Sequence, residues 1–325
     1  MPTLTFQECT VECTPDETVL DALNRQGLEV PSSCRNGVCQ TCLMHATEGN
    51  PPRTAQQGLK ETLIAQGYFL ACMCKPTESL TLCLPDDSVV QKVRARVIYK
   101  EYLNADILRL RLLPCGAFTY RAGQFVQIHR PDGLIRSYSI ASVPTLDPLI
   151  ELHVRLLPNG SMTTWIHKEV GEGDYVELSG AKGDCFYLQG NTTRNILLIG
   201  TGSGLAPLWG IVRSALYAGH EGEIHLYHGS WKPGGLYLEA ELHALARDYP
   251  QFRYYPCVDD GAEAHHQQGR ADKIALAQHK NLSGWQVYLC GHPEMVKSTK
   301  RNAFLAGANL PDIYADPFIL SVPSK

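Results

Sequence analysis

Long apolar runs are missing from this sequence of 325 residues. No stretch approaches the roughly 18 to 20 consecutive apolar residues that a membrane-spanning helix needs. The N-terminus also lacks a basic segment followed by an apolar core, which is the pattern of a secretory signal peptide. We therefore expect a cytoplasmic protein that does not associate with membranes.

Basic runs with interleaved aromatic residues, internal repeats and low-complexity tracts are also missing. The first of these absences argues against nucleic-acid binding. The composition, with 44% hydrophobic and 19% charged residues, is that of an ordinary globular protein. A chain of this length exceeds one typical domain, so two or three domains are expected.

Negative charge is concentrated in the N-terminal part of the chain. Residues 1–88 contain eleven acidic and five basic residues, a net charge of −6, whereas the rest of the chain carries +2. An acidic module is suited to docking on the basic surface of a partner protein. A solvated acidic face without a partner is the alternative explanation.

Four of the twelve cysteines have the spacing of metal ligands. In a chain without a secretion signal, cysteine groups are more often ligands or catalytic residues than disulfides. Cys34, Cys39 and Cys42 follow the pattern C-x4-C-x2-C, and Cys72 follows after 29 further residues. This is the ligand spacing of a plant-type [2Fe–2S] ferredoxin, and Gly37 lets the loop turn where a Cβ would clash. The sequence therefore predicts a one-electron carrier near the N-terminus.

The other eight cysteines have a simpler explanation. At least six of them are expected to be small buried hydrophobic residues. Cys74 lies close enough to Cys72 to compete as the fourth ligand. A non-enzymatic module whose cysteines hold zinc is an alternative hypothesis for the whole group.

Three segments differ in their pattern of apolar residues. The first has strand-like stretches at 3–5 and 9–13 and a helical stretch at 18–27, and a hinge is expected at 85–88. The second contains many short strands and one small helix at 163–168, which favours an antiparallel barrel. Its expected strands are 93–100, 107–113, 125–129, 136–141, 150–156 and 175–178.

The third segment alternates strands with helices. The apolar run at 195–200 is typical of a strand that is covered on both faces. Further strands are expected at 223–227, 252–258 and 286–289, and this alternation predicts a doubly wound parallel sheet. The expected domains are 1–88, 93–190 and 191–325.

The sequence Arg136-Ser137-Tyr138-Ser139 lies on an expected strand of the second segment. An arginine can make two charge-assisted bonds to a pyrophosphate, a tyrosine ring can pack on a flavin, and a serine hydroxyl can reach the flavin N5 edge. Alternation places Arg136 and Tyr138 on one face of the strand and Ser139 on the other. Four such residues alone also fit an ordinary surface strand, but the segments on either side favour a flavin site.

Closely spaced glycines follow the first strand of the third segment. In Gly200-Thr201-Gly202-Ser203-Gly204, backbone N–H groups can reach a pyrophosphate, and Pro207 suits a first helical turn. The third glycine comes one position too early for G-x-G-x-x-G. No acidic residue follows the second strand, where a Rossmann dehydrogenase needs one for the ribose.

The order of these three segments resembles the ferredoxin–NADP reductase superfamily, and in particular the reductase components of ring-hydroxylating dioxygenases. The resemblance covers essentially the whole chain. It implies a β-grasp ferredoxin domain with a [2Fe–2S] cluster, an antiparallel β-barrel that binds FAD, and an α/β doubly wound domain that binds NAD(P)H. The sequence around Cys72 matches the family, so we favour it over Cys74 as the fourth ligand.

The resemblance also implies roles for individual residues. It assigns Arg136 to the FAD pyrophosphate, and Ser137, Tyr138 and Ser139 to the flavin. Further flavin-site residues are His153, Val154 and Arg155, together with Gly160, Ser161, Met162 and Thr163 at the start of the short helix. The nicotinamide nucleotide is expected to contact Gly200, Thr201, Gly202, Ser203, Gly204, Pro207, Ser230, Lys232, Cys290 and Gly291.

Three residues are expected to act at the reacting centre. The resemblance places Cys290 beside the nicotinamide and the aromatic ring of Phe318 near the flavin, with Ser139 at N5. Lys232 could meet a 2′-phosphate, but no arginine accompanies it, so NADH is favoured and NADPH remains an alternative. The pair His265-His266 is expected to be exposed to solvent rather than to hold a metal.

The expected function is electron transfer from NADH through FAD and the [2Fe–2S] cluster to an acceptor protein. The favoured acceptor is an oxygenase that docks near the cluster loop, and the reductase is expected to be a monomer. An alternative is the same relay serving another acceptor, such as a dehydratase that forms deoxysugars.

Overall fold

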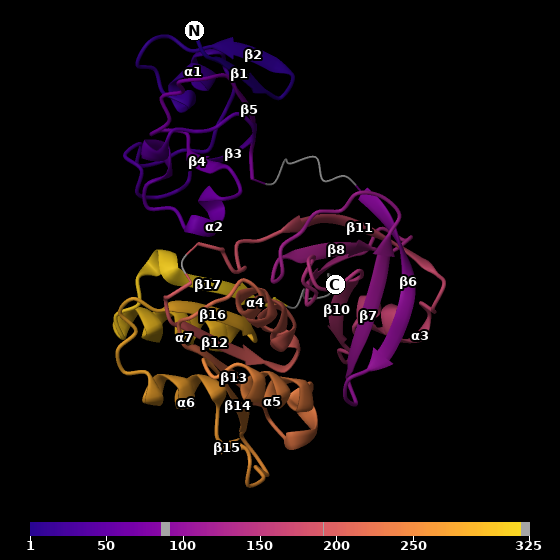
Figure 1. Cartoon of the computed structure of the whole chain (residues 1–325). Helices are drawn as coiled ribbons and strands as arrows, with labels where there is room; N and C mark the ends of the chain where they lie inside the picture. The colour runs from indigo at the N-terminus through magenta and orange to yellow at the C-terminus, as the bar shows by residue number, and fades with distance from the viewer. Residues whose placement is uncertain (86–91, 191, 320–325) are drawn as a thin grey trace. The chain divides into compact units, whose positions relative to one another are not determined.

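The computed structural model describes residues 1–85, 92–190 and 192–319 (Figure 1). The chain divides into two compact units, Met1–Val90 and Gln91–Lys325, and each is described by itself. The hinge expected at 85–88 lies outside the described residues except for Pro85. Residue 191, where a further boundary is expected, also lies outside them.

A five-stranded sheet with the strand order β2-β1-β5-β3-β4 forms the N-terminal unit. β1 and β5 are parallel, and the other neighbouring pairs are antiparallel. The strands are β1 (Thr3–Phe6), β2 (Cys9–Glu12), β3 (Leu43–Glu48), β4 (Tyr68–Leu70) and β5 (Leu80–Cys83). The helical segments are α1 (Val19–Arg25), η1 (Arg53–Gln56) and α2 (Glu61–Ile64).

Helix α1 lies where the sequence predicts a helix, and its ends have local causes. The side chain of Thr18 accepts the backbone N–H of Asp21, which caps the first turn. The apolar residues of α1 are buried in the core of the unit. Gly27, with φ of +74°, takes the left-handed conformation that commonly follows a helix.

The first part of the second unit is a six-stranded antiparallel sheet with the order β10-β7-β6-β11-β8-β9. Its strands are β6 (Lys92–Tyr102), β7 (Ile107–Pro114), β8 (Phe125–His129), β9 (Ile135–Ser139), β10 (Ile150–Arg155) and β11 (Tyr175–Lys182). Helix α3 (Ser161–Lys168) begins two residues before the expected helix. A bridge between Ile140 and Leu152 links the segment after β9 to β10, at the other end of the strand order.

A six-stranded parallel sheet with the order β15-β14-β13-β12-β16-β17 forms the second part of this unit. Its strands are β12 (Ile196–Thr201), β13 (Ile224–Ser230), β14 (Phe252–Val258), β15 (Gln267–Gln268), β16 (Gln286–Gly291) and β17 (Ile313–Pro317). Its helical segments are η2 (Gly202–Gly204), α4 (Leu205–Tyr217), η3 (Pro233–Gly235), α5 (Glu239–Asp248), α6 (Ala271–Gln278), α7 (Pro293–Leu305) and η4 (Leu310–Asp312).

Both faces of the parallel sheet are covered by helices, as the apolar run of β12 predicts. Ile196 and Leu198 share one hydrophobic cluster with residues of α4 and α5. Leu197 and Ile199 share another with residues of α6 and α7. The strands expected in both sheets are confirmed with small shifts at their ends, so the doubly wound parallel sheet is also confirmed.

Strands β15 and β17 are not predicted by the sequence. β17 contains Asp316 and Pro317, residue types that are depleted in strands. It forms because β16 offers a parallel edge and because the ring of Tyr314 stacks on Tyr288 at a centroid distance of 4.7 Å. Pairing with a distant partner, rather than local propensity, decides this element.

A buried carboxylate links the neighbouring strands β10 and β7 of the antiparallel sheet. Glu151 of β10 is only 5% exposed, and its Oε2 accepts a hydrogen bond from Nε of Arg111 at 2.7 Å. Nε of Arg109 lies 3.4 Å from Oε1 of the same carboxylate. Burial alone would raise the pKa of Glu151, but the hydrogen bond from His153 and the two arginines outweigh it and lower the pKa to about 2.

We predict that Glu151→Gln lowers the free energy of unfolding of the second unit by about 2–3 kcal/mol, below the cost of breaking a fully buried pair, because Arg109, which is mostly buried, and Arg111, which is half-buried, lose a buried counter-charge. Glu177→Gln is the matched control, since Glu177 pairs with Lys92 on the surface and should cost less than about 1 kcal/mol. Urea unfolding followed by circular dichroism measures both values. Equal costs for the two variants would contradict this explanation.

We also predict that the second unit loses stability as the pH falls below about 6.5. Burial lowers the pKa of seven of its described histidines, to about 4 for His225 and about 3 for His228. The others are His129, His153, His167, His220 and His279. The unfolded chain therefore binds protons at a pH where the folded chain does not, so the stability present above pH 6.5 is lost as the pH falls. A melting temperature that stays constant from pH 7 to about pH 4 would disprove this.

Candidate functional site

The loop between α1 and β3 carries the first three predicted ligands. The N–H of Cys39 points at Sγ of Cys34 at 3.3 Å, and the N–H of Cys34 points at Sγ of Cys39 at 3.5 Å. The loop turns through positive φ values at Arg35 (54°), Gly37 (80°) and Gln40 (58°). These turns direct backbone N–H groups toward the sulfurs, an environment suited to thiolates.

Cys42 and Cys72 form a second pair. Both are buried, and burial together with a hydrogen bond to Cys42 raises the pKa of Cys72 to about 11. By contrast, a hydrogen bond from the Thr41 side chain is the main cause that lowers the pKa of Cys39 to about 6. Cys74 is completely buried, so burial raises its pKa to about 12, and the thiol that adds to this shift is Cys13 rather than a loop cysteine.

The four thiols fit a cluster with two metal ions better than a single zinc ion. A tetrahedral zinc site brings four sulfurs within about 4 Å of one another. Among the described residues, only one group of three or more potential ligand atoms lies mutually within 4.8 Å, and it contains no cysteine. Two separate pairs of thiols are a donor set for two irons.

Five of the remaining eight cysteines are buried, Cys83 is half-buried, and Cys9 and Cys115 are exposed. The expectation that at least six are buried is therefore wrong by one residue. Cys9 lies at the start of an outer strand of its sheet, and Cys115 lies just after β7, where neither side chain is covered.

The glycine loop lies at the carboxyl end of β12, where the strand order of the parallel sheet reverses. A Cβ added to Gly204 would overlap the carbonyl of Cys290 and lie 2.9 Å from Cα of Gly291. Gly202 has φ of +54°, and Pro207 lies in the first turn of α4, as predicted. The result is a cradle of backbone at a sheet position where α/β proteins bind nucleotides.

The three residues expected at the reacting centre lie near one another. Oγ of Ser139 donates a hydrogen bond to Oδ2 of Asp316 at 2.7 Å, and burial raises the pKa of Asp316. Cys290 pairs with Asp316 across β16 and β17. The N–H of Phe318 donates to the carbonyl of Gly291 at 2.8 Å, and its side chain is half-buried.

Two residues at this point were not predicted from the sequence. Asp316 accepts the bond from Ser139, and Sγ of Cys185 lies 3.7 Å from Sγ of Cys290. Burial, followed by the contact with Cys185, raises the pKa of Cys290 well above its usual value, so the thiol is neutral. Asp316 stands two residues before Phe318, but no spacing pattern marks either Asp316 or Cys185.

The expected flavin-binding residues on β9 differ in burial. Arg136 and Ser137 are exposed, and the guanidinium of Arg136 donates to the carbonyl of Ile135 at 2.7 Å. Tyr138 packs against the core of the antiparallel sheet, and burial raises its pKa. Within the described part of the chain, no hydrogen bond or ion pair joins Arg136 to α3 or to the glycine loop, so its guanidinium is available for an anion.

The residues expected at the start of α3 form its first turn. Gly160 is the N-terminal cap without a side-chain bond, and the hydroxyl of Thr163 donates to the Gly160 carbonyl at 3.1 Å. Met162 and Thr163 are buried, and Ser161 is exposed. Arg130, which the sequence analysis did not single out, donates to the carbonyl of Ser161 at 3.1 Å.

Strand β10 directs its expected flavin residues in different directions. Val154 lies in the core of the antiparallel sheet. Arg155 pairs with Asp106 at 2.9 Å and reaches the glycine loop, where Nη1 lies 3.3 Å from the Cβ position of Gly202. The side chain of His153 is fully buried against protein groups and is described below.

Two residues expected to contact the nucleotide lie where β13 ends: Ser230 is its last residue, and Lys232 is on the loop that leads to α5. Ser230 is half-buried next to Gly235, and Lys232 is exposed. Trp231 between them is 66% exposed. No arginine stands between 230 and 238, so Lys232 is the only cation that this loop segment offers to a phosphate.

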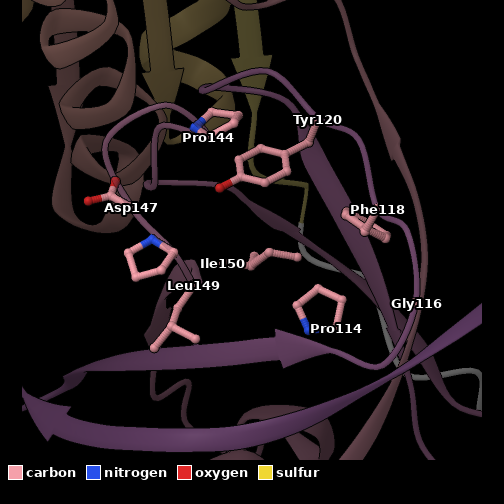
Figure 2. A pocket seen from close by; sticks show the side chains of 9 residues that line it. Pro114, Gly116, Phe118, Tyr120, Pro144, Asp147, Leu149 and Ile150 are labelled. Atoms are coloured by element: carbon pink, nitrogen blue, oxygen red, sulfur yellow. The ribbon is translucent and has the colours of Figure 1, made fainter.

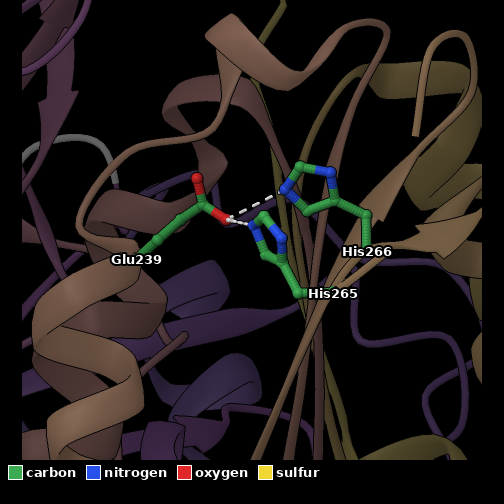
Figure 3. A group of neighbouring side chains, drawn as sticks. All are labelled: Glu239, His265 and His266. Carbon is green, nitrogen blue, oxygen red and sulfur yellow. Dashed lines mark ion pairs between the residues drawn. The ribbon is translucent and has the colours of Figure 1, made fainter. Parts of the chain in front are cut away.

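The expectation that His265 and His266 are both exposed is wrong for His266. The side chain of His266 is only 2% exposed, and its Nε2 lies 3.3 Å from Oε2 of Glu239 (Figure 3). The loop between β14 and β15 thus brings His266 to Glu239, the first residue of α5. His265 is exposed and 4.0 Å from the same carboxylate oxygen.

Glu239, His265 and His266 form the group of closely spaced ligand atoms noted above. The position of the proton on the His266 ring argues against a bound metal ion. Nδ1 of His266 accepts the backbone N–H of Glu263 at 3.1 Å. The proton of the neutral ring is therefore on Nε2, the atom that faces Glu239. A metal-bound imidazole instead donates its second N–H to a neighbour, so this arrangement is that of a His–Glu pair.

A cavity of about 260 Å³ lies beside the loop between β9 and β10 (Figure 2). Proline and aromatic side chains line most of it, including Phe118 and Tyr120. Asp147 at its rim is paired with Arg213 at 2.8 Å. None of the residues expected to bind a cofactor lines this cavity.

Comparison with known families assigns the three parts of the chain. Residues 3–77 match the 2Fe-2S iron-sulfur cluster binding domain, residues 94–187 the oxidoreductase FAD-binding domain, and residues 198–301 the oxidoreductase NAD-binding domain. The matched ranges contain all four cysteines that are expected to hold a cluster, the β9 residues and the glycine loop.

Several characterised proteins are similar along almost the whole chain. The reductase component of the naphthalene 1,2-dioxygenase system of Pseudomonas putida is 31% identical over 92% of this chain and 93% of its own length. Reductase component 1 of terephthalate 1,2-dioxygenase from Comamonas sp is 31% identical over 95% of this chain and 94% of its own. The crystal structure of the Amycolatopsis cytochrome P450 reductase GcoB superposes with a TM-score of 0.69 at 28% identity, covering 98% of this chain and 99% of that one.

None of the helices in the described part of the chain is long and apolar enough to cross a membrane.

We predict that Gly204→Ala raises the KM for NADH about tenfold, because the new methyl group overlaps the Cys290 carbonyl and pushes the glycine loop away from β16. Gly116→Ala is the matched control, since a Cβ at Gly116 meets no atom within 4 Å and Gly116 has no positive φ. Steady-state reduction of ferricyanide measures both. An unchanged KM in Gly204→Ala would show that the loop does not touch the nucleotide.

Proposed function

The chain belongs to the ferredoxin–NAD(P) reductase family of reductase components with an N-terminal [2Fe–2S] domain, and from this premise we propose that it supplies electrons to an oxygenase. It is an NAD(P)H-dependent oxidoreductase, and its cofactors are NADH or NADPH, FAD and a [2Fe–2S] cluster. Electrons pass from NADH to FAD and then to the cluster. The flavin supplies the step between a two-electron donor and a one-electron acceptor.

Specific residues of this chain would hold each group. We infer that Cys34, Cys39, Cys42 and Cys72 hold the cluster in two pairs of thiolates. Arg136 would bind the FAD pyrophosphate with the first turn of α3, namely Gly160, Ser161, Met162 and Thr163. Ser137, Tyr138, Ser139, Val154 and Arg155 would contact the flavin, as would the backbone of His153.

The nucleotide would bind across the glycine loop and the end of β16. We infer contacts from Gly200 to Gly204, from the α4 N-terminus near Pro207, and from Gly291. Ser230 and Lys232 would meet the ribose end. A single lysine without an arginine fork supports NADH over NADPH.

One observation carries the proposal most directly. The Ser139–Asp316 hydrogen bond and the backbone bond of Phe318 bring a strand of the antiparallel sheet and the tail of the parallel sheet to Cys290. A flavin on β9 and a nicotinamide on the glycine loop would meet at this point. Ser139, Cys290 and Phe318 would then surround the atoms between which the hydride moves.

Strand pairing also supports a fold for the first unit and for the antiparallel sheet. We infer a β-grasp fold for the first unit, because a hairpin, one helix and a parallel β1–β5 pair surround its core. We infer that the antiparallel sheet is a barrel, which the Ile140–Leu152 bridge between its two ends supports. The proposed domains are 1–88, 93–190 and 191–325.

The acceptor is proposed to dock around the cluster loop of a monomeric reductase. Val38 beside Cys39 is 76% exposed, and Met73 beside Cys72 is 37% exposed, so apolar contact surface lies close to the cluster ligands. The relatives serve naphthalene and terephthalate dioxygenases, phenol hydroxylase and an aromatic O-demethylase, which supports an oxygenase acceptor. A deoxysugar-forming dehydratase is the alternative acceptor.

We predict that Cys39→Ser keeps NADH–ferricyanide activity but loses cytochrome c reduction and electron delivery to a purified aromatic-ring oxygenase. The flavin still receives the hydride, but the one-electron exit is missing. Cys9→Ser is the matched control, because Cys9 is an exposed cysteine of the same unit outside the cluster loop. If Cys39→Ser retains cytochrome c reduction, the cluster is not on the electron path.

A further inference from the structure

Three buried polar side chains connect the antiparallel sheet to the parallel sheet. On β10, Leu152 and Val154 face the core of the antiparallel sheet, so Glu151 and His153 face the opposite way. The His153 side chain is completely buried, and its ring reaches Tyr237, which follows β13 in the second part of the unit. These three side chains take no part in the electron path to the cluster or in the flavin contacts proposed above.

The hydrogen bonds of this chain fix its protons. Nε2 of His153 lies 3.0 Å from Oε1 of Glu151, a carboxylate that can only accept, so Nε2 carries the proton. Nδ1 of His153 must then accept, and the hydroxyl of Tyr237 donates to it at 3.1 Å. Burial lowers the pKa of His153, which keeps the ring neutral in this arrangement.

The far end of the chain lies among the loops that would hold the nucleotide. The Tyr237 ring packs edge-on against His228 at a centroid distance of 5.4 Å, and His228 lies on β13 two residues before Ser230. Burial lowers the pKa of His228 to about 3, and in the parallel sheet His228 pairs with Gly200, the first residue of the glycine loop. Tyr237 therefore contacts His228, which lies between the glycine loop and the loop that follows β13.

Two further contacts cross between the sheets at the same edge. Nδ2 of Asn104, in the turn between β6 and β7, donates to the carbonyl of Gly235 at 3.2 Å. Arg155 on β10 lies beside Gly202, as described above. The loops after β12 and after β13 are thus both anchored to the antiparallel sheet. Of these contacts, the His153–Tyr237 hydrogen bond is the one that is buried on both sides.

We propose that the Glu151–His153–Tyr237 chain sets the position of the nucleotide-binding loops relative to the flavin strand, so that His153 and Tyr237 are positioning residues for hydride transfer. The inference rests on the hydride route proposed above. In that step NADH gives a hydride, two electrons and one proton nucleus, to FAD and leaves as NAD⁺.

The contact between the two sheets is made by polar side chains rather than apolar ones. An apolar pair of similar volume would hold two sheets together without the desolvation cost of a carboxylate, an imidazole and a phenol. Hydrogen bonds add direction, because the Tyr237 hydroxyl must point at one nitrogen of a ring that Glu151 already orients. Misplacement of reacting groups by about 1 Å costs on the order of a hundredfold in rate, so a small rotation at this contact reaches the chemistry.

The second unit contains a matched control for this contact. The hydroxyl of Tyr187 lies 3.1 Å from Nδ1 of His220, both residues are buried, and their rings are edge-on at 5.6 Å. His220 precedes β13 and therefore lies at the amino edge of the parallel sheet, away from the glycine loop. Tyr187→Phe removes the same kind of hydrogen bond without touching the nucleotide loops.

The test compares Tyr237→Phe with Tyr187→Phe in the protein that carries both FAD and the cluster. We expect both variants to lose similar stability, but only Tyr237→Phe to slow flavin reduction by NADH, about tenfold in single-turnover stopped flow. The dissociation constant for NAD⁺, measured by calorimetry, should stay the same, because the nucleotide contacts remain. Hydrogen exchange of residues 230–238 should rise only in Tyr237→Phe.

Several results would contradict the positioning role of Tyr237 or the hydride route on which it rests. Equal slowing in both variants, or a lower melting temperature in Tyr237→Phe with unchanged flavin reduction, would reduce the contact to ordinary packing and overturn the proposal. If NADH failed to reduce the flavin of the unchanged protein, the hydride route would fail instead. Unchanged exchange of residues 230–238 would exclude loop positioning whatever the kinetics.

Discussion

Close approach of backbone at the carboxyl ends of β12 and β16 is the constraint on which the nucleotide site depends. At Gly204 a single added carbon would overlap the carbonyl of Cys290, and at Gly291, with φ of +119°, it would lie 2.7 Å from Oγ1 of Thr201. Only glycine permits both contacts. At its glycines the loop therefore presents backbone N–H groups instead of side chains, at the point where the strand order of the sheet reverses.

A second constraint is polar and lies between the two sheets of the same unit. Glu151 accepts from His153 and Arg111, with Arg109 close by, so both oxygens of the buried carboxylate have partners. Buried charge is costly unless it is paired, and it then specifies geometry more than it adds stability. The same carboxylate orients the imidazole that meets Tyr237, so the ion cluster and the proposed positioning chain are one structure.

Much of the site was predictable because its chemistry depends on local spacing. A cysteine loop must bring three thiols together within nine residues, so Cys34, Cys39 and Cys42 are visible in the sequence as a pattern. The glycine loop and the strand with Arg136 and Tyr138 are equally local. Asp316, Cys185 and Tyr237 carry no such pattern, because each acquires its partner from a strand or loop far away in the sequence.

The sequence alone therefore determined the order of the three segments, the four cysteines that are proposed to hold the cluster and the backbone cradle, since spacing and residue type mark these within short stretches of the chain. The tertiary structure decided the rest. It made β17 a strand through a partner edge, buried His266 although it stands in a polar loop, and joined the side chain of His153 to Tyr237. Alternation along β10 predicts that His153 and Val154 face opposite ways, but only the packing of two sheets shows what each side chain meets.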